Sequence, residues 1–310
     1  MKIVHVVGAR PNFMKIAPIM RAATDYRNIE QVLVHTGQHY DENMSDWFFE
    51  ELGIPEPDVN LEVGSGYHGE QTGEIMKRFE SFILENGADI VVVVGDVNST
   101  IACGLVVTKL HIPLAHVEAG LRSYDRRMPE EINRLLTDAI SDYLFTPAEE
   151  ANNNLIKEGV PKEKIFLVGD VMIDTLIWEM ERTDCIDEPP LDNLINGQYA
   201  VLTLHRPSNV DNRETFEGIV EALNTISEDI EIVFPAHPRT QERMKEFNLY
   251  PDEGVRIIDP LSYRDFLRLY RNSLFVLTDS GSIQQETTYL DIPCLTIREN
   301  TERPFTITKG

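Results

Sequence analysis

The stretch IVVVVGDVNST, residues 90–100, is the clearest sign of the fold. An apolar run ends at Gly95-Asp96, and a helical pattern begins directly afterwards. The stretch PLAHVEAG, residues 113–120, repeats this arrangement and stops at Glu118. Apolar runs of this length are typical of buried strands in a parallel sheet. A carboxylate directly after such a strand points to the sheet edge where α/β proteins bind ligands.

A third acidic position, the pair Glu130-Glu131 in RRMPEEINR, follows closely. Any single Asp or Glu is ordinarily a helix N-cap or a surface charge. Three acidic positions within 35 residues, from Asp96 to Glu130, favour a shared site instead. Acid–base chemistry is therefore the first functional hypothesis.

Composition narrows the class of protein. The 310 residues are 42% hydrophobic, enough to build two cores, and carry a formal net charge of −24. The electrostatic field of so negative a protein repels nucleic acid and anionic membranes. A small phosphorylated ligand stays possible in a basic cleft. Three widely spaced cysteines suggest neither a disulfide framework nor a metal site. No signal peptide or membrane span is apparent, so we expect a cytoplasmic, soluble protein.

Short strands alternate with helical patterns along the whole chain, which predicts right-handed βαβ units and mostly parallel sheets. Around Pro189-Pro190 the pattern is interrupted, and it restarts at Tyr199. We therefore expect an α/β protein with two Rossmann-like, doubly wound domains facing a central cleft. The predicted limits are 1–170 for the first domain, 171–197 for the connection and 198–310 for the second.

Cations and hydroxyls follow the predicted strands in four motifs. VVGARPNFMK places Arg10 and Lys15 near a helix start, and LTLHRPSN ends a strand with His205-Arg206. VFPAHPR supplies His237, and LTDSGSIQQE places Ser280-Gly281-Ser282 where a helix opens. Backbone N–H groups and the helix dipole favour anions at such positions, so a diphosphate fits. Phe266 is read as either a core aromatic or a ring that stacks on a base.

With these motifs in place, the chain resembles the non-hydrolysing UDP-N-acetylglucosamine 2-epimerases. The resemblance also rests on HTGQHYD, AHVEAGLRS, MPEEINR and NTERP and covers nearly the whole chain. It implies a GT-B type architecture and reversible conversion of UDP-GlcNAc to UDP-ManNAc through elimination of UDP and its re-addition. It also implies that no metal or nicotinamide cofactor is needed, that the protein is a homodimer, and that it serves surface polysaccharide synthesis.

The resemblance assigns roles residue by residue. It makes Asp96, Glu118 and Glu130 the acid–base candidates, with their division of labour open. The diphosphate or leaving oxygen is assigned to His205, together with Arg10, Arg206, Ser280, Gly281 and Ser282. Glu286 resembles the ribose ligand, Phe266 the residue against the uracil, and Arg303 a sugar or phosphate contact. Lys15 and Arg134 are further phosphate or carboxylate contacts, and Gln38 and His39 lie where some members bind a second UDP-GlcNAc as activator. His237 is a candidate phosphate donor because of its position after a strand rather than by the resemblance.

Three departures limit this transfer. Ser282 replaces a usual glycine, Gln285 replaces a usual glutamate, and the chain ends at Gly310, where members generally continue. The end implies either truncation or a different way of closing the second domain. A hydrolysing 2-epimerase, an epimerase of a UDP-diacetamido sugar, a GT-B glycosyltransferase and a non-catalytic UDP-sugar sensor are the alternatives.

Overall fold

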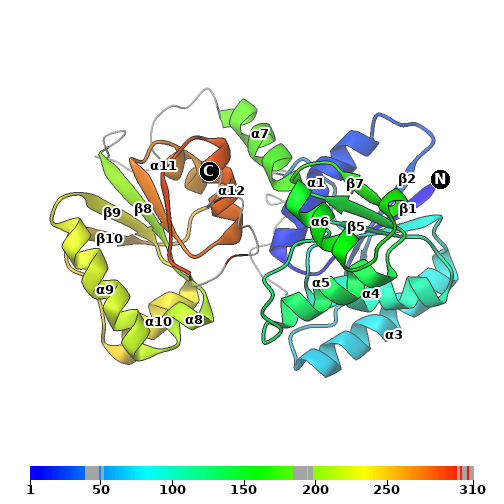
Figure 1. Ribbon diagram of the computed structural model, residues 1–310, viewed down its shortest axis with the longest axis horizontal. Coiled ribbons are helices and arrows are strands. Elements are labelled where there is room, and N and C mark those ends of the chain that lie inside the picture. Colours follow the sequence, from blue (N-terminus) through cyan, green and yellow to red (C-terminus); the bar gives the residue numbers. More distant parts are fainter. Residues whose placement is uncertain are drawn as a thin grey trace. The chain divides into compact units, whose positions relative to one another are not determined.

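The computed structural model describes residues 1–38, 49, 52–183, 194, 198–298, 301 and 306. The chain divides into two compact units, Met1–Thr175 and Leu176–Gly310. Each unit is built on its own parallel sheet with helices on both faces, which confirms the predicted α/β class (Figure 1). The narrower domain limits given above stay a prediction. No helix in the described part of the chain is long and apolar enough to cross a membrane.

The first unit, which we call unit 1, contains a seven-stranded sheet in the order β3-β2-β1-β4-β5-β6-β7. All its neighbouring pairs are parallel. The strands are β1 (Lys2–Val7), β2 (Glu30–His35), β3 (Val59–Asn60), β4 (Ile90–Val94), β5 (Leu114–Val117), β6 (Tyr143–Thr146) and β7 (Ile165–Leu167). The helices are α1 (Arg10–Ala23), α3 (His68–Asn86), α4 (Asn98–Lys109), α5 (Pro129–Ile140), α6 (Glu149–Lys157) and α7 (Val171–Thr183), which continues into the second unit.

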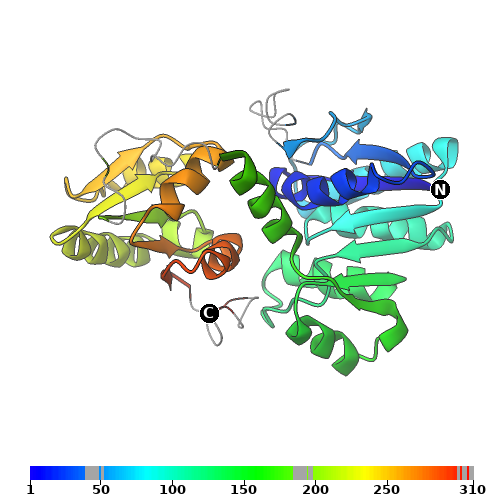
Figure 2. The ribbon, with the colours of Figure 1, turned by 90° about the horizontal axis from the view of Figure 1, so that it is seen from above.

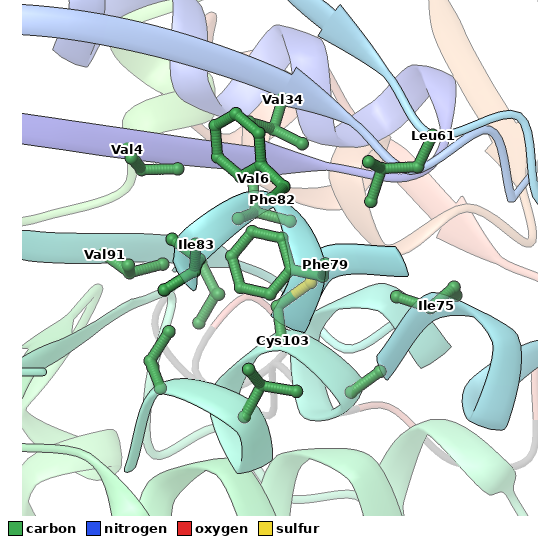
Figure 3. Close-up of a cluster of buried hydrophobic side chains, with 14 of the residues drawn as sticks. Val4, Val6, Val34, Leu61, Ile75, Phe79, Phe82, Ile83, Val91 and Cys103 are labelled. Carbon is green, nitrogen blue, oxygen red and sulfur yellow. The ribbon is translucent and has the colours of Figure 1, made fainter. Parts of the chain in front are cut away.

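Alternate side chains of the central strands enter two separate cores of unit 1. Val91 and Val93 of β4 pack with Phe79 of α3 and Cys103 of α4, as Figure 3 shows around these helices. The intervening residues of β4 pack instead against α1, through side chains such as Phe13. This period of two explains why the strand reads as a continuous apolar run, since both of its faces are buried. Figure 1 shows α3 and α4 on one side of the sheet, and in Figure 2 α1 lies across the other.

Unit 2 contains a five-stranded parallel sheet in the order β10-β9-β8-β11-β12. Its strands are β8 (Tyr199–Thr203), β9 (Glu231–Pro235), β10 (Val255–Ile258), β11 (Phe275–Thr278) and β12 (Cys294–Thr296). Its helices are α8 (Pro207–Val210), α9 (Arg213–Ser227), α10 (Pro238–Phe247), α11 (Tyr263–Arg271) and α12 (Gly281–Tyr289). Phe216 of α9 and Met244 of α10 close the core on one face.

Both sheets reverse their strand order at one internal point. In unit 1 the reversal lies between β1 and β4, and in unit 2 it lies between β8 and β11. At such a point neighbouring connections leave toward opposite faces of the sheet, which opens a crevice beyond the carboxyl ends of the strands. The segments after these four strands contain Arg10, Asp96, His205 and Ser280. The topology therefore places predicted site residues at the switch point of each unit.

Candidate functional site

The turn from β1 into α1 is held tightly against the end of β4. Asn12 accepts hydrogen bonds from the backbone N–H groups of Gly8 and Ala9, both at 3.0 Å. Its Nδ2 donates to the carbonyl of Val94 at 3.1 Å. A Cβ at Gly8 would lie 2.1 Å from Oγ of Ser99, so only glycine fits there. These contacts fix the start of α1, where Arg10 is the first residue and half-buried.

Glu118 forms a buried ion pair with Lys15. Its side chain lies directly after β5 and its backbone has φ +70°, in the left-handed region that non-glycine residues rarely occupy. Strain of this kind collects at functional sites, where it aims a side chain. Glu118 is 6% exposed and Lys15 is 9% exposed. The predicted acid and the predicted cation therefore form one buried unit.

Asp96 is the more accessible carboxylate, with a side chain 32% exposed. Its Oδ2 lies 3.7 Å from Nε of Arg134 on α5. Its backbone carbonyl accepts a hydrogen bond from Nδ2 of Asn133, also on α5, at 2.9 Å. Asp96 and Glu118 follow the neighbouring strands β4 and β5, as predicted, and each has a cation close by.

The two glutamates at the start of α5 differ sharply in environment. Glu131 is 1% exposed, and its carboxylate accepts hydrogen bonds from the backbone N–H groups of Ser123 and Tyr124 at 2.9 and 3.0 Å. It also lies 3.2 Å from Arg134. Glu130 is exposed, in the first turn of the helix. Glu131 thus holds the preceding loop, whereas Glu130 is accessible to a ligand.

Asp279 organises the strand ends of unit 2. Its Oδ2 accepts hydrogen bonds from the backbone N–H groups of His205 and Arg206, at 2.9 and 2.8 Å. Its Oδ1 lies 2.9 Å from Nδ1 of His205. Burial would raise the pKa of Asp279, but these donors outweigh it and hold the pKa below the usual value. An ionised, fully buried carboxylate therefore orients His205, whose ring is 42% exposed.

His237 lies beside His205, with ring centroids 5.9 Å apart. Burial lowers the pKa of His237, as do the nearby charges of His205 and Arg239. Its Nδ1 accepts a hydrogen bond from the backbone N–H of Arg239, which requires the ring nitrogen to be unprotonated. His237 is therefore arranged as a neutral donor through Nε2.

The start of α12 lies directly after β11, where the sequence predicts that a helix opens. Ser280 is the N-cap, and Gly281 is the first helical residue. Ser280 and Ser282 are both half-buried. The positive end of the helix dipole is directed here, next to the His205-Arg206 turn that Asp279 holds in place.

Glu286 lies farther along α12 and is 1% exposed. It accepts hydrogen bonds from the hydroxyls of Tyr270 and Tyr263, the latter at 3.2 Å. Burial, followed by the charge of Glu286, raises the pKa of both tyrosines, so both hydroxyls remain donors. Phe266 packs against Tyr270 with ring centroids 5.1 Å apart and is half-buried.

The sequence profile of the UDP-N-acetylglucosamine 2-epimerase family matches residues 21–310. The chain belongs to this family. An epimerase of Methanocaldococcus jannaschii is 47% identical over 319 residues, covering 100% of this chain and 87% of that protein. A UDP-2,3-diacetamido-2,3-dideoxy-D-glucuronate 2-epimerase of Pseudomonas aeruginosa is 42% identical over 313 residues, with coverages of 100% and 87%.

Solved structures agree with this assignment. The M. jannaschii UDP-GlcNAc 2-epimerase in complex with UDP-GlcNAc and UDP superposes with a TM-score of 0.90 at 46% identity, covering 100% of this chain and 87% of that one. The Neisseria meningitidis enzyme bound to UDP-GlcNAc gives 0.91 at 29% identity, with coverages of 99% and 85%. The chain is therefore an epimerase with the GT-B architecture.

The remaining predicted ligand residues of this epimerase are Gln38, His39 and Arg303. Gln38 is 5% exposed, and its Oε1 accepts hydrogen bonds from the backbone N–H and the hydroxyl of Ser99 at 3.0 and 2.7 Å. Its side chain therefore helps to hold the start of α4. His39 and Arg303 lie outside the described residues.

Sequence reasoning missed the residues that support the site. Asp279 directly follows β11 and could have been recognised by the same signal as Asp96, a carboxylate after a strand. Glu131 could not be separated from Glu130 by sequence, because their difference lies in which side of α5 faces the loop. In the described segments, no group of three or more His, Cys, Asp or Glu side chains is arranged to hold a metal ion.

Proposed function

We propose that this enzyme interconverts UDP-N-acetylglucosamine and UDP-N-acetylmannosamine by inverting C2. In the forward direction a carboxylate removes the C2 proton while the C1–O bond to UDP breaks. The electron pair of the C2–H bond becomes the C1=C2 double bond of a 2-acetamidoglucal. A second acid then returns a proton to the opposite face of C2, and UDP adds back at C1.

The observation that carries this proposal is that β4 and β5 are adjacent in one sheet and that Asp96 and Glu118 lie within two residues of their carboxyl ends. Two positioned carboxylates suit a reaction that takes a proton from one face and returns one to the other. The buried ion pair with Lys15 holds the Glu118 carboxylate in place at the end of β5. Glu130, exposed at the start of α5, joins them as a relay.

We assign UDP binding to unit 2. His205, Arg206 and the N-terminus of α12 present donors for the diphosphate, and their charge stabilises UDP as it leaves. His237 adds a further donor, Glu286 binds the ribose, and Phe266 packs against the uracil. Ser282 presents a hydroxyl on the first turn of α12.

The diacetamido sugar is the second candidate substrate. The 42% identity to the P. aeruginosa 2-epimerase spans all of this chain, close to the 47% seen for the M. jannaschii enzyme. Both reactions invert C2, which carries an acetamido group in either sugar, so the same acids serve both. The difference would lie in groups that contact C3 and C5 of the sugar.

Product analysis tests the proposal. The enzyme is incubated separately with UDP-GlcNAc and with the UDP-diacetamido sugar, and the products are followed by ¹H and ³¹P NMR. We expect UDP-ManNAc from the first substrate at the faster rate. Release of free ManNAc and UDP would identify a hydrolysing epimerase instead. Turnover of the UDP-diacetamido sugar alone would make that sugar the substrate. We also propose a homodimer in the cytoplasm, which sedimentation and fractionation test.

A further inference from the structure

A buried histidine lies between the two acid-bearing loops of unit 1. His116 is on β5 and is 0% exposed. Its Nδ1 lies 2.6 Å from Oδ1 of Asp138 on α5, and its Nε2 lies 2.9 Å from the carbonyl oxygen of Gly95. Gly95 directly precedes Asp96. One ring nitrogen therefore contacts the backbone of the Asp96 loop.

Asp138 makes the corresponding contact to the other loop. Its Oδ2 accepts a hydrogen bond from the backbone N–H of Gly120 at 3.1 Å, two residues after Glu118. The same oxygen lies 2.7 Å from Nη1 of Arg122, in the same loop. A Cβ at Gly120 would lie 2.5 Å from the carbonyl of Ala151, so this loop has little room to shift.

Both ring nitrogens of His116 lie within hydrogen-bond distance of an oxygen, Nδ1 of Oδ1 of Asp138 and Nε2 of the Gly95 carbonyl. Burial would raise the pKa of Asp138, but His116 and Arg122 together hold it below its usual value. Arg122 also pairs with Glu158 through two nitrogens, at 2.8 and 2.6 Å. The Arg122 cation thus lies against both carboxylates, which offsets the cost of burying Asp138.

A connection of this kind serves more than stability. The distance between Asp96 and Glu118 decides whether both reach C2 of one sugar, and a shift of about 1 Å costs about 100-fold in rate. Neither His116 nor Asp138 is exposed, so neither touches substrate. Their contacts go to the backbone on either side of the two acids, which is where the spacing is set.

We propose that His116 and Asp138 are positioning residues that fix the Asp96 loop and the Glu118 loop relative to one another, so that proton removal and proton return stay matched at C2. This inference rests on the proposed function, because it needs two acids that act on one carbon. If the loops separate, the elimination can still proceed, but the glucal is reprotonated late and escapes with UDP.

The fraction of the glucal intermediate that is released distinguishes a positioning role of His116 and Asp138 from a purely structural one. A purely structural pair, when broken, lowers the melting temperature and the folded fraction, but each folded molecule still partitions its intermediate as the wild type does. A positioning pair changes the partition itself. The quantity to measure is therefore the amount of 2-acetamidoglucal and UDP released per UDP-ManNAc formed.

The experiment compares His116→Gln and Asp138→Asn with His5→Gln. His5 is a suitable control because it is also 0% exposed in the same sheet, and its Nε2 lies 3.0 Å from Oε1 of Gln31, away from both acids. We expect kcat to fall about tenfold or more in the first two variants, with UDP affinity changed less than about twofold and glucal release raised about fivefold. The control should keep the wild-type ratio.

An unchanged release ratio in folded His116→Gln and Asp138→Asn would overturn the proposal, whatever the loss of kcat. If both are unfolded by circular dichroism, His116→Asn decides, because its amide keeps a donor toward Asp138 and loses the one toward Gly95. A wild-type ratio in that variant also overturns the proposal. Failure of the wild-type enzyme to form any UDP-ManNAc would instead refute the proposed function, so the two failures are distinct.

Discussion

His205 and Asp279 form a pair in which Nδ1 lies 2.9 Å from Oδ1, while the backbone N–H of His205 donates to Oδ2 at 2.9 Å. Asp279 is 0% exposed, whereas the His205 ring is 42% exposed. A buried carboxylate therefore orients an accessible imidazole and leaves its Nε2 available. This arrangement is compatible with the role proposed for His205 at the departing diphosphate.

Replacing Asp279 by Asn tests this orientation. The amide keeps the size of the carboxylate but removes the charge that favours a donating His205, and its NH2 group cannot accept from backbone N–H groups. We expect kcat/KM to fall about 100-fold or more. Steady-state kinetics check this, with Asp211→Asn as the control, because Asp211 pairs with Arg239 and Arg243 outside this turn. Equal losses in both variants would contradict the role of Asp279.

We expect substitutions of the two neighbouring glutamates of α5 to have different effects, one on turnover and the other on stability. Glu130→Gln changes an exposed side chain, so we expect a normal melting temperature with turnover lowered about 100-fold or more. Glu131→Gln weakens the bonds to Ser123 and Tyr124, so we expect a loss of about 1–3 kcal/mol of stability. Thermal denaturation and activity measured on the same samples separate the two. A destabilised Glu130→Gln that keeps its turnover would show the assignment to be reversed.

Glu286 gives a third prediction, through its two tyrosine donors. Tyr270→Phe removes one hydrogen bond to the buried carboxylate, so the carboxylate is held less firmly toward the ribose. We expect UDP to bind about tenfold more weakly by calorimetry, and 2′,3′-dideoxy-UDP to bind with little change.

Tyr199→Phe is the matched control for that variant. Tyr199 is also buried, and its hydroxyl donates to the carbonyl of Leu269 at 2.6 Å, with no part in the Glu286 contact. If Tyr270→Phe weakens both nucleotides equally, Glu286 does not act on the ribose.

Stability at low pH should depend on His5. Burial lowers the pKa of His5 from 6.5 to about 4, so the folded state favours the neutral ring. The stabilising contribution is fully present above pH 6.5 and is lost as the pH falls toward 4, because the unfolded chain binds the proton first. The loss amounts to about 3 kcal/mol by linkage. The free energy of unfolding is measured in urea at pH 7 and at pH 4.5. We expect it to fall less between these pH values in His5→Gln than in the wild type. Identical losses would contradict this.

The sequence predicted which strands lead to the candidate residues, because that information lies in short stretches of the chain. Val91 and Val93 face one core while the residues between them face the other, so β4 reads as an unbroken apolar run and its end at Asp96 is visible. The apolar runs of the stretches 90–100 and 113–120 coincide with β4 and β5. The very short β3 was not predicted, since two residues carry no pattern.

The contacts that hold the candidate residues in place could not be predicted in the same way. The contact between His116 and Asp138 joins residues 22 apart on different elements, and neither periodicity nor a motif encodes it. The same holds for the tyrosines at Glu286, which come from another helix. The left-handed backbone of Glu118 also has no sequence signal, because glutamate does not ordinarily adopt it.

The most direct test of the account measures deuterium at C2. Wild type, Asp96→Asn and Glu118→Gln are incubated with UDP-GlcNAc in D2O, and the affinity of each for UDP is measured in parallel. We predict that the wild type places deuterium at C2 of both UDP-sugars, and that the variants bind UDP normally but incorporate deuterium slower by orders of magnitude. Wild-type incorporation by either variant, or no deuterium in the products of the wild type, would contradict the assignment of C2 proton transfer to these carboxylates.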